Sequence, residues 1–243
     1  MRRAPLFVPL LALLALVSCR PAPPRVIAPE VVADAKSAFI IVDSLPLYTL
    51  AGNALTYREA VPLGEKLSLS GKTAIVTQAG RNRDFHEVKR LSGTTGWVRA
   101  DQVASHAILS AVTAAEAQLY VRPSEGALAG TALPRATLMA IDIDTAGTVF
   151  LKVTAYDVRA KMLLRDVYIK NEGVSSRFAD VEPAILLRLA AASSSLTQRN
   201  AFLSSGIKDY PDSAFIEDLK AARQVIDAPL TPAPDAPAPA DTP

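Results

Sequence analysis

The residue types that most often carry out catalysis are scarce in this chain. It has one cysteine and two histidines, His86 and His106, which excludes an internal disulfide or a cysteine-based metal site and leaves little for a metal centre or a catalytic triad. The serine run at 193–195 lacks the glycines of a nucleophile elbow. The sequence also lacks a Gly-rich phosphate-binding loop. We therefore expect a protein that is not an enzyme and that holds no cofactor.

Two carboxylates, Asp142 and Asp144, are the remaining candidates for binding a cation. They stand two residues apart where an expected strand gives way to a turn. The full ligand pattern of a calcium loop is absent around them, so the sequence favours a solvated turn and predicts no metal site. His86 stands alone in an expected strand, and we interpret it as a structural or solvent-facing residue.

The aromatic residues offer a different chemistry, the binding of a ligand against flat rings. Residues 85–89 alternate in the way a strand does, with Phe85 and Glu87 on one face and His86 and Val88 on the other. A glycine-containing turn follows and ends at Gly96-Trp97-Val98. Trp97 is thus delivered at the end of a hairpin, where a large ring can plug one end of a small barrel or lie across a groove.

These residues resemble the signature of the bacterial Src-homology-three (SH3-like) family, an aromatic-x-x-Val strand, a short turn and then Gly-Trp-Val. The resemblance implies a small β-barrel over residues 38–104, and the five or six short strands punctuated by turns in that range fit one. In family members that bind a ligand, aromatic residues near the first strand and the tryptophan line a shallow groove. The corresponding candidates for ligand binding here are Tyr48, Tyr57 and Trp97, whereas we interpret Phe85 as a core residue.

A weaker copy of the same pattern occupies residues 107–176. Tyr120 lies in a segment that resembles the family's opening Asn-Val-Arg-x-x-Pro segment, so it is also a candidate for ligand binding. Tyr168 stands where the tryptophan would be, the glycine before it is missing, and residues 156–165 form an inserted charged stretch that we expect to be exposed. The chain therefore reads as two tandem copies of one barrel, the second divergent, with a chance recurrence as the alternative.

The N-terminus carries the features of an export signal. A basic start precedes an apolar run at 6–17 that is too short for a membrane span, and the run ends in Leu-Val-Ser-Cys at 16–19. This resembles the lipobox of bacterial lipoproteins, which implies cleavage after residue 18 and lipid attachment to Cys19. An ordinary secretory leader is the alternative. The predicted location is the cell envelope, with the protein anchored to a bacterial membrane through lipid on Cys19.

The remaining segments are a linker, a helical region and a tail. Residues 19–37 are rich in proline and predict an extended spacer. Residues 177–228 show helical spacing, with Val181, Ile185 and Leu189 on one face and a plausible cap at Ser195. We interpret this region as a packing appendage, and residues 229–243, rich in proline and alanine, as a disordered tail.

The predicted fold is mainly β, with two small SH3-like barrels followed by a short helical segment. A formal net charge of +2 gives no sign of nucleic-acid binding. The leading hypothesis is a non-enzymatic envelope lipoprotein whose barrels bind a peptidoglycan peptide or a protein segment. The alternative is a structural or assembly lipoprotein that docks envelope proteins without binding the cell wall.

Overall fold

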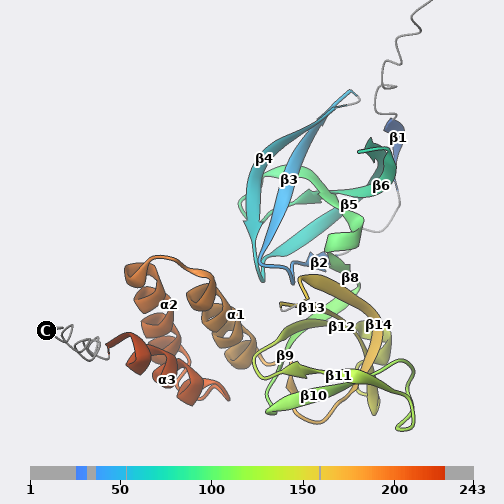
Figure 1. The fold of residues 1–243 in the computed structure, drawn as a ribbon. Helices are drawn as coiled ribbons and strands as arrows, with labels where there is room; N and C mark the ends of the chain where they lie inside the picture. The colour runs from blue at the N-terminus through green and yellow to red at the C-terminus, as the bar shows by residue number, and fades with distance from the viewer. Residues whose placement is uncertain (1–25, 32–36, 53, 159, 228–243) are drawn as a thin grey trace, which may run out of the picture.

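A computed structural model describes residues 26–31, 37–52, 54–158 and 160–227. This part of the chain is mainly β, with two sheets followed by three helices at its C-terminal end (Figure 1). The predicted leader, Cys19 and the tail at 229–243 lie outside the described residues. Within them, none of the helices combines the length and apolar composition that a bilayer crossing requires.

The N-terminal sheet contains eight strands, and seven of them form one path in the order β4-β3-β7-β6-β5-β2-β8. Their bounds are β1 Val26–Val31, β2 Ser37–Phe39, β3 Ser44–Ala51, β4 Ala54–Pro62, β5 Lys66–Gln78, β6 Arg81–Lys89, β7 Thr95–Arg99 and β8 Ala104–Ser105. The main core of this sheet is built from the alternating apolar positions of its strands, among them Leu45, Leu47, Val88 and Val98, which are fully buried.

The C-terminal sheet follows the same plan, in the order β11-β10-β14-β13-β12-β9-β15. Its bounds are β9 Ala107–Val112, β10 Glu116–Tyr120, β11 Leu128–Pro134, β12 Leu138–Asp142, β13 Phe150–Asp157, β14 Met162–Lys170 and β15 Val174–Ser175. Taken in chain order from β2 and from β9, each strand of one sheet has a counterpart at the same place in the other. The matching extends to single residues, because Tyr48 pairs with Trp97 in the first sheet and Tyr120 with Tyr168 in the second.

One strand lies where the sequence predicted only a spacer. Within the predicted linker 19–37, β1 pairs antiparallel with β5, and the register shifts between Ile27 and Glu30. Pro29 stands in this irregular stretch, the kind of position in a sheet that tolerates a proline. Pairing with a long neighbouring strand therefore overrides the preference of this proline-rich sequence for a free spacer.

The predicted helical region is present and contains three helices, α1 Phe178–Ala192, α2 Leu196–Asp209 and α3 Ile216–Asp227. The expected cap of α2 is confirmed, since the Ser195 hydroxyl accepts a hydrogen bond from the backbone N–H of Gln198. The start of α1 is held by Asp180, a buried carboxylate that accepts hydrogen bonds from the Ser175 hydroxyl at 2.6 Å and the Ala214 N–H at 2.8 Å.

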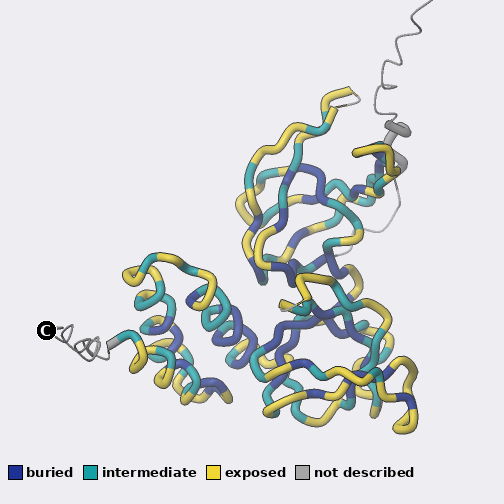
Figure 2. The backbone as a smooth tube through the Cα atoms, viewed as in Figure 1, coloured by how far each residue is buried: buried dark blue, intermediate teal, exposed yellow. Residues whose placement is uncertain are grey.

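Helix α1 is not a loose appendage but joins both sheets. One buried cluster unites Val181 and Ile185 of α1 with Leu63, from the turn after β4, and with Ala111 and Leu138 of the second sheet. At the far end of the helix, the Arg188 Nε donates to Asp43 Oδ1 at 2.6 Å. Figure 2 shows the buried residues running along the inner faces of the sheets and the inner sides of the helices.

The inserted stretch 156–165 is largely exposed, as predicted, with Val158, Lys161 and Arg165 among its exposed residues, but it also makes contacts that the sequence did not reveal. Its ends belong to β13 and β14, and Tyr156 and Leu163 pack against the core cluster of the N-terminal sheet. The Arg165 guanidinium donates to the carbonyl of Val103 at 3.2 Å. Lys161, which lies between these contacts, is exposed, and the hairpin as a whole ties the second sheet to the first.

Candidate binding cleft

The aromatic residues predicted to bind a ligand in the first sheet form a row across neighbouring strands. Tyr48 on β3 stands opposite Tyr57 on β4 and opposite Trp97 on β7. Cross-strand partners project to the same face of a sheet, so the three side chains share one face. The Tyr48 ring also meets the edge of Phe85 with a centroid separation of 6.0 Å.

The exposure of these rings differs sharply along the row. Trp97 is 6% exposed and packs with Ala74, Val76 and Phe85 in a small cluster apart from the main core. Tyr48 is half-buried against that cluster, whereas Tyr57 is 60% exposed. Most of the Trp97 surface is thus taken up by packing, and the binding roles assigned to Trp97, Tyr48 and Tyr57 stay predictions.

Tyr120 in the second sheet has the same kind of environment. It is buried, and its ring meets Phe150 in an edge-on contact with a centroid separation of 5.1 Å. Its cross-strand partner Tyr168 is half-buried. The ligand-binding role of Tyr120 therefore also stays a prediction, and these rings contribute to packing.

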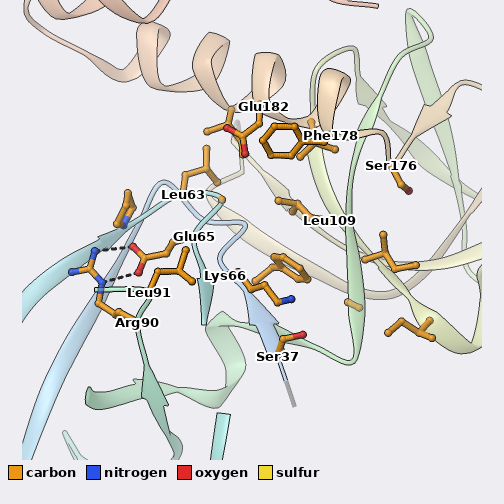
Figure 3. Close-up of a pocket in the computed structure, with 18 of the residues that line it drawn as sticks. Ser37, Leu63, Glu65, Lys66, Arg90, Leu91, Leu109, Ser176, Phe178 and Glu182 are labelled. Atoms are coloured by element: carbon orange, nitrogen blue, oxygen red, sulfur yellow. Dashed lines mark hydrogen bonds and ion pairs between the residues drawn. The ribbon is translucent and has the colours of Figure 1, made fainter. Parts of the chain in front are cut away.

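A large hollow lies elsewhere, where the two sheets and α1 meet (Figure 3). This cleft has a volume of about 910 Å³. Its first wall is Phe39, Leu63 and the turn at 90–92 of the N-terminal sheet, its floor is the start of β9, and its second wall is the first two turns of α1. We refer to it below as the cleft.

The rim of the cleft carries large apolar side chains that the fold leaves in solvent. Leu91 is 82% exposed and Phe178 is 68% exposed, and Ile108 and Ile143 are also exposed. The four come from a turn, a helix start, a strand and the short 3₁₀ helix Ile143–Thr145, and yet they surround the same hollow. Single exposed apolar residues are ordinary, but a group gathered around one cleft marks an interaction surface.

One charged group of the cleft is fully engaged within the protein. The Arg90 guanidinium donates to both carboxylate oxygens of Glu65, at 2.8 and 2.7 Å (Figure 3). It also pairs with Glu59 at 2.8 Å. The hydrogen bonds that Arg90 donates to Glu65, and then to Glu59, raise the pKa of Arg90 further above its ordinary value. This network fixes the turn that displays Leu91, so Arg90 positions the rim and is not free to bind a ligand.

Glu182 of α1 is the contrasting case. It is half-buried on the cleft wall, and in the described residues its carboxylate makes neither a hydrogen bond nor an ion pair. Burial raises the pKa of this carboxyl because the charged form loses water contact. Lys66, across the cleft, keeps its ammonium in solvent, 6.0 Å from the centroid of the Phe39 ring.

The acidic pair weighed above as cation ligands is joined by a histidine from a distant segment. His106 Nε2 lies 3.2 Å from Asp144 Oδ1, and the ligand atoms of His106, Asp142 and Asp144 all lie within 4.8 Å of one another. Asp142 also accepts a hydrogen bond from the Asp144 N–H, as in the predicted polar turn. His86 is half-buried between β5 and β7, and burial lowers its pKa more than nearby Asp84 raises it.

Comparison with known proteins adds little to this description. No protein-family model and no curated protein matches the chain. Two solved structures are similar in part, both described as being from Trichomonas vaginalis. NlpC2 is 14% identical with a TM-score of 0.23, over 65% of this chain and 56% of that one. NlpC1 is 13% identical with a TM-score of 0.23, over 67% of this chain and 54% of that one. The chain therefore spans little more than half the length of either protein, and at these scores neither fold nor function is carried over.

The cleft could not be found from the sequence, because its walls come from segments that lie far apart along the chain. The sequence contains only a weak local indication of the cleft, in Leu91 and Phe178. Leu91 stands in a polar turn, and Phe178 opens a helix just outside the apolar stripe of Val181 and Ile185. Each on its own is an ordinary exposed apolar residue.

Proposed function

We propose that this protein is a non-enzymatic, lipid-anchored envelope protein that docks a segment of a partner protein in the cleft between its sheets and α1. Its sheets, in this proposal, are two SH3-like units, and Cys19 carries the lipid that holds them at a bacterial membrane. The observation that carries the docking function is the ring of exposed apolar side chains around the cleft, Leu91, Ile108, Ile143 and Phe178.

The lining of the cleft favours a protein segment over a cell-wall peptide. Aliphatic and aromatic side chains from both sheets and α1 dominate it, and its arginine is already neutralised by Glu65 and Glu59. Apolar surface of this kind is stabilised by covering it with other apolar side chains, at about 25 cal/mol for each Å² removed from water. A muropeptide offers mostly polar groups, so it would leave that gain largely unused.

The test compares capture by the full chain and by variants of the rim. Leu91→Ser and Phe178→Ser change exposed side chains, so both variants are expected to fold normally. The matched control is Val225→Ser on α3, which is also highly exposed but does not line the cleft. Each protein, purified with its anchor in detergent, is incubated with detergent-extracted envelope proteins and separately with purified peptidoglycan.

We expect the wild type and Val225→Ser to retain the same envelope protein, and the two rim variants to lose it. Retention of all the same proteins by the rim variants would exclude the cleft as the docking site. Capture by peptidoglycan that is equal in all four proteins would instead favour cell-wall binding through another surface, such as the exposed ring of Tyr57.

A further inference from the structure

The floor of the cleft is a strand with a free edge. Strand β9 pairs with β12 over residues 107–111 on one side, but with β15 only at Ala111 and Val112 on the other. In the described part of the chain, residues 107–110 therefore have a strand neighbour on one side alone. The unpaired peptide groups of such an edge are a template for an additional strand.

The free edge opens directly into the cleft. Ala107, Ile108 and Leu109 line it, and β15 ends at Ser175, after which the chain turns away into α1. One end is closed by Ser176, whose hydroxyl lies 2.6 Å from that of Ser110. The three residues before this closed end, Ala107 to Leu109, span roughly 10 Å at about 3.3 Å per residue, which is room for a strand of about three residues. The Ile108 carbonyl already accepts a hydrogen bond from the Ser110 hydroxyl at 3.3 Å.

Side chains of a strand added here would enter two different surroundings. Alternate residues of a strand point to opposite faces, so one set would contact the apolar walls while the other set would face away. The walls offer Phe39 and Leu63 on one side and Phe178 and Val181 on the other. The same ligand, an extended peptide with alternating apolar residues, thus satisfies both the free edge and the apolar walls.

The charges of the cleft add a further requirement. Arg90 is already paired with Glu65 and Glu59, and the ammonium of Lys66 stays hydrated. Glu182 alone is half-buried without a partner in the described residues, and a bound segment would remove more of its water. A carboxylate loses free energy when it is desolvated unless a cation or a hydrogen-bond donor replaces the water. The partner must therefore bring such a group to this place.

We infer that the cleft receives an extended segment of a partner protein, which adds as a short strand to the free edge of β9 and places a lysine or arginine side chain against Glu182. This inference rests on the proposed docking function and specifies the chemistry of what docks. A neutral apolar strand is bound less tightly, and an acidic one least tightly, because both leave the Glu182 carboxylate without a cation.

The experiment uses synthetic peptides as probes, so it does not depend on knowing the partner. The first is a fluorescein-labelled hexapeptide that alternates valine and threonine and carries one lysine. The second replaces the lysine by glutamate, and the third keeps the lysine but has alternate backbone nitrogens methylated, which blocks pairing with a strand edge. Binding to the full chain in detergent is measured by fluorescence polarisation.

We expect the lysine peptide to bind about tenfold more tightly than the glutamate peptide, the size of one charge-assisted hydrogen bond. Glu182→Gln should abolish this preference, while the control Glu217→Gln, an exposed residue paired with Lys220 on α3, should keep it. The methylated peptide should lose binding. Amide hydrogen exchange of residues 107–110 should slow when the lysine peptide is bound.

Three results would overturn the inference: a lysine preference that survives Glu182→Gln, equal binding of the methylated peptide, or unchanged exchange at residues 107–110 in the bound state. Failure of all three peptides to bind would overturn it as well. The docking function is judged separately, by whether Leu91→Ser and Phe178→Ser lose the captured envelope protein. That capture can depend on the rim while being indifferent to Glu182 and to strand addition.

Discussion

Replacing Trp97 by alanine separates the two roles that the sequence allowed for this ring. The side chain is 6% exposed and is surrounded by Phe85, Val76 and the half-buried Tyr48. A tryptophan buries about 150–250 Å² of surface, and its neighbours, which are held on their own strands, would relax only partly into the space it leaves. We therefore expect Trp97→Ala to lower the free energy of unfolding by about 3–5 kcal/mol.

The assay is urea unfolding followed by circular dichroism, because Trp97 is the only tryptophan and its removal also removes the fluorescence signal. The matched control is Tyr57→Ala in the same cross-strand row. Tyr57 is 60% exposed, and truncating it should change the free energy of unfolding by less than about 1 kcal/mol. The slope of the transition should be similar in both variants, so the midpoints can be compared directly.

The reasoning would be refuted if the two variants unfolded at the same urea concentration as the wild type. In that case the ring would contribute no packing energy despite its burial. If the Trp97→Ala variant kept its stability but lost cell-wall binding, the result would instead support the ligand-binding groove that the family resemblance implies. A large loss of stability together with unchanged capture of envelope proteins is the outcome that the structure supports.

Three further outcomes are expected. Cys19→Ala should move the protein from the detergent phase to the aqueous phase in detergent partitioning, and a variant that stays in the detergent phase would rule out the lipid anchor. Gly96→Ala should lower the melting temperature by several degrees, because its Cβ would lie 2.6 Å from Leu47 Cγ, whereas Gly126→Ala, with open space around it, should not. Asp180→Asn should lower stability at pH 7 by about 1–3 kcal/mol. Burial raises the pKa of Asp180, but its hydrogen bonds and a nearby arginine outweigh burial and hold the pKa below its ordinary value. Its contribution is thus present above the unfolded-state pKa and lost as pH falls through the folded one, so wild type and variant should begin to converge below about pH 4, the ordinary pKa of an aspartate, in acid unfolding curves.

The elements predicted best are those whose signals are local. Alternation around Phe85 and the turn before Trp97 predicted β6 and β7, and the apolar stripe of Val181 and Ile185 predicted α1. Ser195 predicted the start of α2 because a cap depends only on the adjoining turn. Such elements can be predicted from the local sequence alone, without knowing which residues pack against them.

Features decided by tertiary contacts were missed. The strand β1 exists because β5 extends far enough to pair with it, which its own prolines argue against. The stretch 156–165 is largely exposed, as its charge predicted, but the contact of Tyr156 and Leu163 with the core of the first sheet was not predicted. The cleft itself is formed where the two sheets and α1 pack together, and no local sequence pattern predicts how these elements are placed relative to one another.

The common strand order of the two sheets has a consequence for how the chain folds. Tandem units of one topology risk misassembly, in which a strand of one unit completes the sheet of the other. Strand β14 occupies the place of β7, and Val167 stands at the position of Gly96, one residue before the aromatic partner of the bridge. At Gly96 the surroundings leave no room even for a Cβ, which would meet Leu47 and the carbonyl of Tyr48. A wrongly inserted β14 would bring a whole valine side chain against these atoms. Gly96 therefore disfavours the pairing of β14 in the place of β7.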